Sequence, residues 1–123
     1  MDFKQIDIID IHQYLPEAKK AGLVFCDNTV MFGVYDGAKL MSFCGMLFYA
    51  NKVILKNAYV PAEHRSKGLY KYMMQSMMNV ARDRGIKKAE GTCTKMSLPH
   101  CLKIGFRIIK EYKEYTKVIH ENL

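Results

Sequence analysis

The sequence predicts an α/β domain with a mixed sheet, in which an antiparallel meander leads into a strand–helix–strand unit. Three observations support this. Strand-like segments joined by short turn sequences fill residues 29–60. A helix with one apolar face is expected over residues 68–84. A further strand-like segment at 86–93 follows it directly, and a helix that connects two strands in this way makes them parallel.

Length and composition indicate one globular domain. The chain has 123 residues, 50% hydrophobic and 25% charged, which suits a single domain over 1–123. No apolar run approaches the roughly 20 residues that a membrane-spanning helix needs. The N-terminus is acidic and lacks the basic-then-apolar order of a secretion signal. We therefore expect a cytoplasmic protein with no membrane contact.

The four cysteines form no CxxC pair. In a reducing compartment, Cys26, Cys44, Cys93 and Cys101 are expected to be free, buried thiols. A zinc site made by Cys93, His100 and Cys101 is the alternative, but it lacks the paired ligand spacing of zinc folds. The sequence therefore predicts no metal.

The N-terminal third is the least readable part of the chain. Residues 2–7 predict a short edge strand. Apolar residues over 8–20 fit an amphipathic helix, although Pro16 fits poorly in a helix interior and two shorter pieces are the alternative. Gly22 would end this segment. Residues 23–26 are extended or helical, and Asp27 and Asn28 predict a turn.

Three strands then follow one another. Residues 29–35 have the β-branched and aromatic content of a strand, and Asp36-Gly37 is the strongest hairpin signal in the chain. Residues 39–49 and 53–60 give the second and third strands. Pro61 ends the third, because proline has no N–H to donate.

The second half begins with the long helix. Its expected buried face consists of Leu69, Tyr72, Met73, Met77, Val80 and Ala81, widened by Met74 and Met78. Gly85 ends the helix, and residues 86–93 form a strand. Ser97 and Pro99 begin a short helix that ends before Gly105. Residues 106–119 predict two strands that turn near Lys113-Glu114.

Positive charge is concentrated in the second half of the chain. Residues 1–63 carry six Lys/Arg against seven Asp/Glu, whereas residues 64–123 carry thirteen against five. This excess is either a solvated basic surface or an attraction for an anion such as a nucleotide cofactor, nucleic acid or an acidic partner. Nucleic-acid binding would use Tyr112 and Tyr115, but no known nucleic-acid motif supports it, and we expect none.

The loop at residues 65–70 has the chemistry of a phosphate site. The first amides of a helix lack internal partners and carry the positive end of its dipole. Gly68 allows the backbone to approach an anion closely, and Arg65 and Lys67 add mobile charge at the rim. The loop therefore predicts a pyrophosphate cradle.

This order of features resembles the GNAT superfamily of acetyl-CoA-dependent N-acetyltransferases, from about residue 29 to the end. The family signature Gln/Arg-x-x-Gly-x-Gly/Ala is matched by Arg65-Ser66-Lys67-Gly68-Leu69-Tyr70, after a strand that ends at Val60-Pro61. The family's Lys-Leu-Gly-Phe segment is matched by Lys103-Ile104-Gly105-Phe106. The resemblance implies a mixed sheet with helices on both faces.

Two residues depart from the family pattern. Tyr70 stands where a glycine or alanine is usual. Cys101 stands where the family commonly has the tyrosine that protonates the leaving thiolate. The cofactor-binding loop therefore follows the family pattern more closely than the position of the usual acid does.

The resemblance implies acetyl-CoA as the cofactor and a small or protein amine as the substrate, which attacks the thioester directly in a ternary complex. The pyrophosphate would rest on the amides of residues 65–70, and the pantetheine arm would pair with the third strand. The expected cofactor-binding residues are Ala58, Tyr59, Val60, Arg65, Ser66, Lys67, Gly68, Leu69 and Tyr70.

Catalysis requires a base, because an exposed lysine amine has a pKa near 10.4 and must be neutral to attack. Glu63 and His64 are the candidates, with Asn57 or Tyr59 acting through water as alternatives. The candidates for the acid are His100, Cys101 and Tyr112, although Cys101 also fits as a buried core residue.

Two further expectations accompany this function. The alternative is a catalytically degenerate module of the same fold that binds CoA or a protein partner. An exposed sheet edge near the C-terminus also predicts a homodimer.

Overall fold

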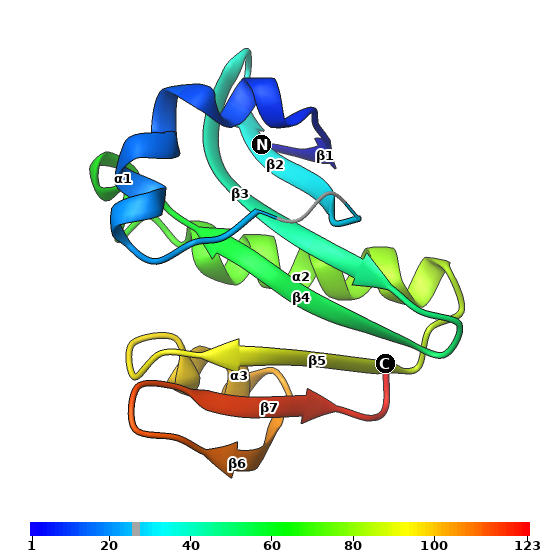
Figure 1. The fold of residues 1–123 in the computed structure, drawn as a ribbon. Helices are drawn as coiled ribbons and strands as arrows, with labels where there is room; N and C mark the ends of the chain where they lie inside the picture. The colour runs from blue at the N-terminus through cyan, green and yellow to red at the C-terminus, as the bar shows by residue number, and fades with distance from the viewer. Residues whose placement is uncertain (26–27) are drawn as a thin grey trace.

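The computed structural model describes residues 1–25 and 28–123 and confirms the mixed α/β fold. Its seven-stranded sheet has the order β1-β2-β3-β4-β5-β7-β6 (Figure 1). The strands are β1 (Asp2–Gln5), β2 (Val30–Asp36), β3 (Lys39–Phe48), β4 (Lys52–Tyr59), β5 (Lys88–Cys93), β6 (Arg107–Glu111) and β7 (Thr116–His120). Among the strands of the described residues, only β4 and β5 are parallel, as expected for two strands joined through a helix. Our expectations for Cys26 and Asp27 lie outside the described residues.

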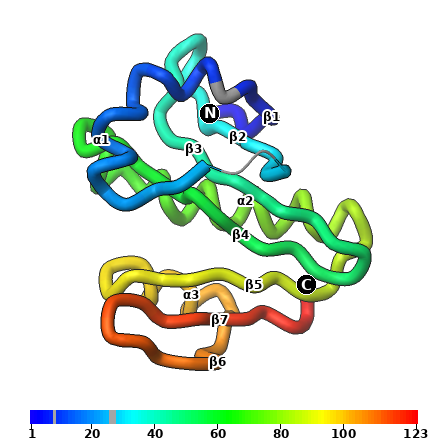
Figure 2. The backbone as a smooth tube through the Cα atoms, in the orientation of Figure 1, coloured from blue at the N-terminus to red at the C-terminus, as the bar shows by residue number. Residues whose placement is uncertain are grey.

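Helical segments cover both faces of the sheet (Figures 1 and 2). The 3-10 helix η1 (Ile8–Tyr14) and α1 (Leu15–Lys20) lie on one face. The long helix α2 (Leu69–Asp83) and the short helix α3 (Leu98–Lys103) lie on the other, and η2 (Ala62–His64) leads into the loop before α2. Pro16 lies in the first turn of α1, where its missing N–H costs nothing. The two-piece alternative for residues 8–20 is therefore the correct one.

Strand alternation divides the core into two clusters. In β3, Phe43 points to the cluster under η1 and α1, while Cys44 and Met46 point to the cluster under α2. The α2 face is the predicted one with a small rotation: Met74 and Met78 are buried, whereas Tyr72 and Val80 are half-buried. Gly85, with a φ of 74°, ends the helix as expected.

The hairpin between β2 and β3 turns one residue later than its sequence signal suggested. Asp36 is the last residue of β2 and pairs with Lys39, so Gly37 and Ala38 form the turn. Gly37 has a φ of 61°, which glycine adopts without strain. The two strands meet across a two-residue loop, and their register shifts by one residue between Val34 and Tyr35.

The parallel pair at the centre of the sheet is short. β4 and β5 pair only from Lys52 with Lys88 to Ile54 with Glu90, and beyond that point the strands part. β4 also carries one extra residue opposite β3 near Asn57, whose φ is 54°. Such a bulge bends the strand, and here it lies beside the gap between β4 and β5.

The C-terminal strands form a second antiparallel pair. The predicted turn near Lys113 and Glu114 is confirmed, and Tyr112 N–H donates to Tyr115 O at 2.8 Å to close it. β6 lies at the edge of the sheet, and all of its residues are exposed. The homodimer through this edge stays a prediction. Within the described residues, no helix has the length and apolar content to cross a membrane.

Candidate active site

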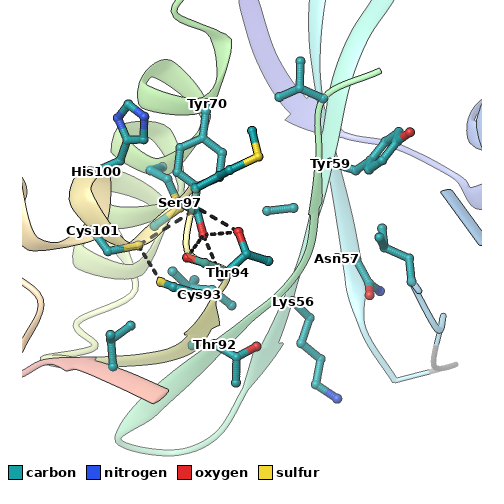
Figure 3. A pocket seen from close by; sticks show the side chains of 18 of the residues that line it. Lys56, Asn57, Tyr59, Tyr70, Thr92, Cys93, Thr94, Ser97, His100 and Cys101 are labelled. Atoms are coloured by element: carbon teal, nitrogen blue, oxygen red, sulfur yellow. Dashed lines mark hydrogen bonds between the residues drawn. The ribbon is translucent and has the colours of Figure 1, made fainter. Parts of the chain in front are cut away.

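A cavity of about 1180 Å³ lies where β4 and β5 part. At one end it meets the loop before α2, including Arg65 and Gly68. At another it meets the connection after α1, including Leu23 and Val24. Since these two segments flank opposite faces of the sheet, the cavity passes through the sheet at the gap. Figure 3 shows the side chains around it.

The loop at the start of α2 has the backbone geometry of an anion site. Ser66 and Gly68 both have positive φ angles, 64° and 75°, and Gly68 immediately precedes the helix. Alternation of left- and right-handed residues turns successive amides toward one side, where they join the free amides of the first helical turn. A Cβ added to Gly68 would have no heavy atom within 4 Å, so the space in front of it is open. The positive φ of Ser66 was not expected from its residue type.

The two basic residues of the loop differ in position. Arg65 lines the cavity, but its Nε donates to Val60 O at 2.9 Å and its guanidinium lies 5.7 Å from the centre of the Tyr59 ring. These contacts place the exposed Arg65 side chain against the end of β4, and its predicted role as mobile charge at the rim stays a prediction. Lys67 is exposed and does not line the cavity.

The expected cofactor strand also borders the cavity, through Ala58, Tyr59 and Val60. The Tyr59 side chain points away from the gap (Figure 3), and its hydroxyl donates to Glu17 Oε2 at 2.9 Å. Tyr59 therefore borders the gap with its backbone, and its ring lies on the face of the sheet that α1 covers. Leu69 and Tyr70, which were also predicted to bind the cofactor, line the cavity as well.

His64 is buried, with 2% of its surface exposed, and lines the cavity. Its Nε2 is 3.5 Å from the Tyr14 hydroxyl and 3.4 Å from Glu63 Oε1. The Tyr14 hydroxyl donates to Leu40 O at 3.0 Å, so both neighbours of Nε2 are acceptors. The proton of a neutral His64 therefore belongs on Nε2. Within the described part of the chain, Nδ1 has no hydrogen-bond partner, and it is left with a free lone pair.

Glu63 itself is exposed and does not line the cavity. Its carboxylate contacts His64 from outside, which suits an orienting role better than direct contact with a substrate.

A sulfur-rich cluster forms the wall opposite β4. Cys101 Sγ lies 2.9 Å from Cys93 Sγ and 3.8 Å from the Tyr70 hydroxyl, and all three residues line the cavity (Figure 3). Hydrogen bonding from Cys93 lowers the pKa of Cys101 to about 7, assisted by Tyr70 and opposed by burial. The hydrogen bond to Cys101 and burial both raise the pKa of the Cys93 thiol. Burial and the nearby Cys101 raise the pKa of Tyr70, whose hydroxyl therefore keeps its proton.

The remaining predicted catalytic residues lie apart from each other. His100 lines the cavity, and its ring centre is 5.5 Å from that of Tyr70. Tyr112 is 42% exposed at the turn between β6 and β7, where it stacks on Tyr115 with ring centres 4.6 Å apart. The structure does not bring Tyr112 to the cavity.

The zinc alternative has no support in the described residues, among which no group of three or more His, Cys, Asp or Glu side chains could hold a metal ion. Cys93 and Cys101 are in contact, but the ring of His100 packs against Tyr70. Cys44, Cys93 and Cys101 are free and buried, as predicted for them.

Sequence reasoning missed several residues of the cavity wall. Leu23 and Val24 come from a segment whose structure the sequence left open. Thr94 and Ser97 bond to each other beside the cysteines, with Thr94 N–H donating to Ser97 Oγ at 3.0 Å. Ser97 was expected only as a helix cap, and its pairing with Thr94 three residues earlier was the available signal.

No family model and no curated protein matches the chain by sequence. Its structure, however, resembles those of known acetyltransferases. PaiA N-acetyltransferase from Thermoplasma acidophilum, solved in complex with coenzyme A, has a TM-score of 0.79 at 13% identity, with 98% of each chain covered. The IAA acetyltransferase from Bacillus cereus has a TM-score of 0.76 at 18% identity, again with 98% of each chain covered. A GNAT family acetyltransferase from Elizabethkingia anophelis with acetyl-CoA bound has a TM-score of 0.72 at 10% identity, with 98% and 97% covered.

Proposed function

We propose, on the premise that the chain has the GNAT fold, that it transfers an acetyl group from acetyl-CoA to a primary amine by direct attack in a ternary complex. The observation that carries the proposal is the cavity. It joins a helix N-terminus suited to phosphate with a buried histidine that has a free nitrogen, across a gap between two strands.

The cofactor fits this cavity on features of the chain itself. The amides at residues 66–70 would hold the pyrophosphate, because they begin a fifteen-residue helix and have open space before them. The β4 backbone from Ala58 to Val60 would pair with the amides of the pantetheine arm, since β5 does not pair there. Arg65 already donates a hydrogen bond to the Val60 carbonyl. When the cofactor binds, Arg65 would share this carbonyl with it or move aside.

His64 is our choice for the base. Its Nε2–H donates to the Tyr14 hydroxyl, with Glu63 Oε1 3.4 Å from Nε2, which leaves Nδ1 to accept a proton from the substrate ammonium, directly or through one water. The proton acquired there turns His64 into an imidazolium, and the exposed Glu63 carboxylate stabilises that charge.

Tyr70 is our choice for the acid. Its hydroxyl is protonated at neutral pH because its pKa is raised, whereas hydrogen bonding from Cys93 lowers the pKa of the Cys101 thiol. Both lie on the same wall, 3.8 Å apart, so the phenol could donate to a departing thiolate. Tyr70, which departs from the family pattern in the loop, would then have a role in the reaction.

A thermal-shift titration tests the cofactor, and a turnover assay tests the reaction. Saturation to about 100 times Kd should stabilise the protein by about 2.7 kcal/mol. Acetyl-CoA consumption is then measured with a panel of amino acids, polyamines and lysine peptides. No stabilisation by CoA at hundreds of micromolar would refute the whole proposal.

The second candidate is a degenerate module that binds CoA or a protein partner without turnover. Cys101, in the place of the usual acid, is the observation that favours it. CoA binding together with silence across the amine panel, in wild type and in a Cys101→Tyr variant alike, would support this candidate over the enzyme.

A further inference from the structure

We propose that Cys93 and Cys101 form a thiol–disulfide exchange site, in which a low-molecular-weight disulfide entering the cavity is reduced while the two cysteines close to a disulfide. Cys101 is the attacking thiol and Cys93 the resolving thiol. The proposal requires only the cavity and the cysteine pair, so it stands apart from acetyl transfer.

The first argument is proximity. Cys93 is the last residue of β5 and Cys101 lies in the middle of α3, with their Sγ atoms 2.9 Å apart. The two helices and the strand around them hold both side chains in place: Cys93 is 3% exposed and Cys101 is 1% exposed. Two sulfurs already in contact need little movement to form a bond.

The second argument is reactivity. A thiolate, and not a thiol, attacks a disulfide, so an attacking cysteine needs donors that stabilise its charge. Cys101 has two, the Cys93 thiol and the Tyr70 hydroxyl, and its pKa is lowered to about 7. The titratable groups that face Cys101 are Cys93 from β5 and Tyr70 from α2, with His100 of α3 against the Tyr70 ring.

The third argument is access. Cys93 and Cys101 both line a cavity of about 1180 Å³, together with Tyr70, Thr94 and Ser97. Cys44 is the contrast: it is fully buried in the α2 core, it does not line the cavity, and burial raises its pKa. A small disulfide can therefore reach Cys101 without unfolding, whereas it cannot reach Cys44.

The exchange balances in two steps. The Cys101 thiolate attacks one sulfur of the small disulfide, forms a mixed disulfide and releases one small thiolate. The Cys93 thiol then loses its proton to that thiolate and, as a thiolate itself, attacks Cys101 Sγ. This releases the second small thiolate, which takes up the proton that Cys101 lost when it ionised. The protein loses two electrons and two protons, and the small disulfide gains them.

The experiment follows intact protein mass after addition of glutathione disulfide or CoA disulfide. A Cys26→Ser background removes the one thiol that lies outside the described residues. We expect the protein to lose the mass of two hydrogens, with Cys93 and Cys101 joined in the peptide map. In the same background, C93S should trap a stable mixed disulfide on Cys101, and C101S should react at neither position.

The rate supplies a second readout. Adduct formation in C93S should rise as pH increases through the titration of Cys101, and a Tyr70→Phe change should shift that rise to higher pH, since it removes one donor. C44S is the matched control and should react as its parent does. A faster reaction of CoA disulfide than of glutathione disulfide would show that the loop before α2 recruits the nucleotide.

Three results would overturn the proposal: no adduct on Cys101 in folded C93S, an adduct on Cys44 at a similar rate, or a cysteine pair that reacts only under denaturing conditions. Circular dichroism of each variant shows whether it is folded. Since CoA binding is measured separately by thermal shift, failure of the exchange leaves the proposed acetyltransferase untouched, and the reverse also holds.

Discussion

His64 illustrates how one residue acquires its chemistry from its neighbours. Both groups near its Nε2 are acceptors, and among the described residues its buried Nδ1 has no hydrogen-bond partner. We predict that His64→Gln lowers kcat by about 10²–10⁴-fold, the usual contribution of a general base. CoA affinity should be unchanged.

The kinetic signature separates this role from a structural one. H64Q should lose kcat, while its KM for the amine, its circular dichroism and its melting temperature stay near wild type. Glu63→Gln keeps the base and is the matched comparison, with a smaller loss. An H64Q enzyme with wild-type kcat would assign the base to another group.

The Tyr70 hydroxyl is the proposed acid, and removing it tests that role. Tyr70→Phe removes only the hydroxyl and should lower kcat by about 10²-fold, the low end for general acid catalysis, because a thiolate leaves readily. Steady-state kinetics measure the loss, and thermal shift with CoA should show unchanged binding. Tyr72→Phe, two residues further along α2 and half-buried, is the control and should have wild-type kcat. If Y70F and Y72F are equally active, the acid lies elsewhere.

The sequence could not predict the contact that matters most here. Cys93, Cys101 and Tyr70 belong to β5, α3 and α2, and only packing brings them together. Local patterns identified Tyr70 and Cys101 separately, as departures from a family motif. Their contact is a tertiary property, and no spacing in the chain encodes it.

At the scale of elements, α2 offers a matched pair of glycines. Gly68 precedes the helix and Gly85 follows it, with φ angles of 75° and 74° and no heavy atom within 4 Å of an added Cβ at either site. Replacement by alanine should therefore destabilise each end by a similar amount, about 1–2 kcal/mol, through backbone strain alone.

Cofactor binding should distinguish the two variants. Gly68→Ala places a methyl group where the phosphate would lie, so its CoA affinity should fall, while Gly85→Ala should bind as wild type does. Chemical denaturation measures the strain, and calorimetric titration measures the affinity. Equal CoA affinity in both variants would remove the phosphate from this loop.

The elements themselves were largely predictable, for reasons that the structure makes plain. The continuous apolar run of β3, buried from Leu40 to Met46, and the apolar face of α2 are local patterns that tertiary packing preserves. The bulge was not predictable, because Asn57 adopts its positive φ only where β4 bends beside the gap. Nor was the 3-10 form of residues 8–14, which depends on how that segment meets Pro16 and the sheet.

For the whole molecule, the sheet consists of two antiparallel parts joined by one short parallel ladder. Strands β1 to β4 form the first part and β5, β7 and β6 the second, with three residue pairs between them. Backbone groups that face the gap beyond Ile54 and Glu90 have no strand partner, so we predict that their amides exchange with solvent faster than those between β2 and β3.

Added CoA should protect these amides. Near 100 times Kd, exchange at the gap should slow by up to about 100-fold, while the β6–β7 pair at the sheet edge should change little. Hydrogen-exchange mass spectrometry measures both regions in one experiment. Uniform protection across the sheet would indicate global stabilisation and no ligand in the gap.

The methionines of α2 add a mechanical property to this arrangement. Met73, Met74, Met77 and Met78 are buried between the helix and the sheet. Unbranched thioether side chains change shape through three soft torsions, so they fill a space whose outline varies. A layer made of them can therefore adapt its shape if a ligand inserted between β4 and β5 widens the gap.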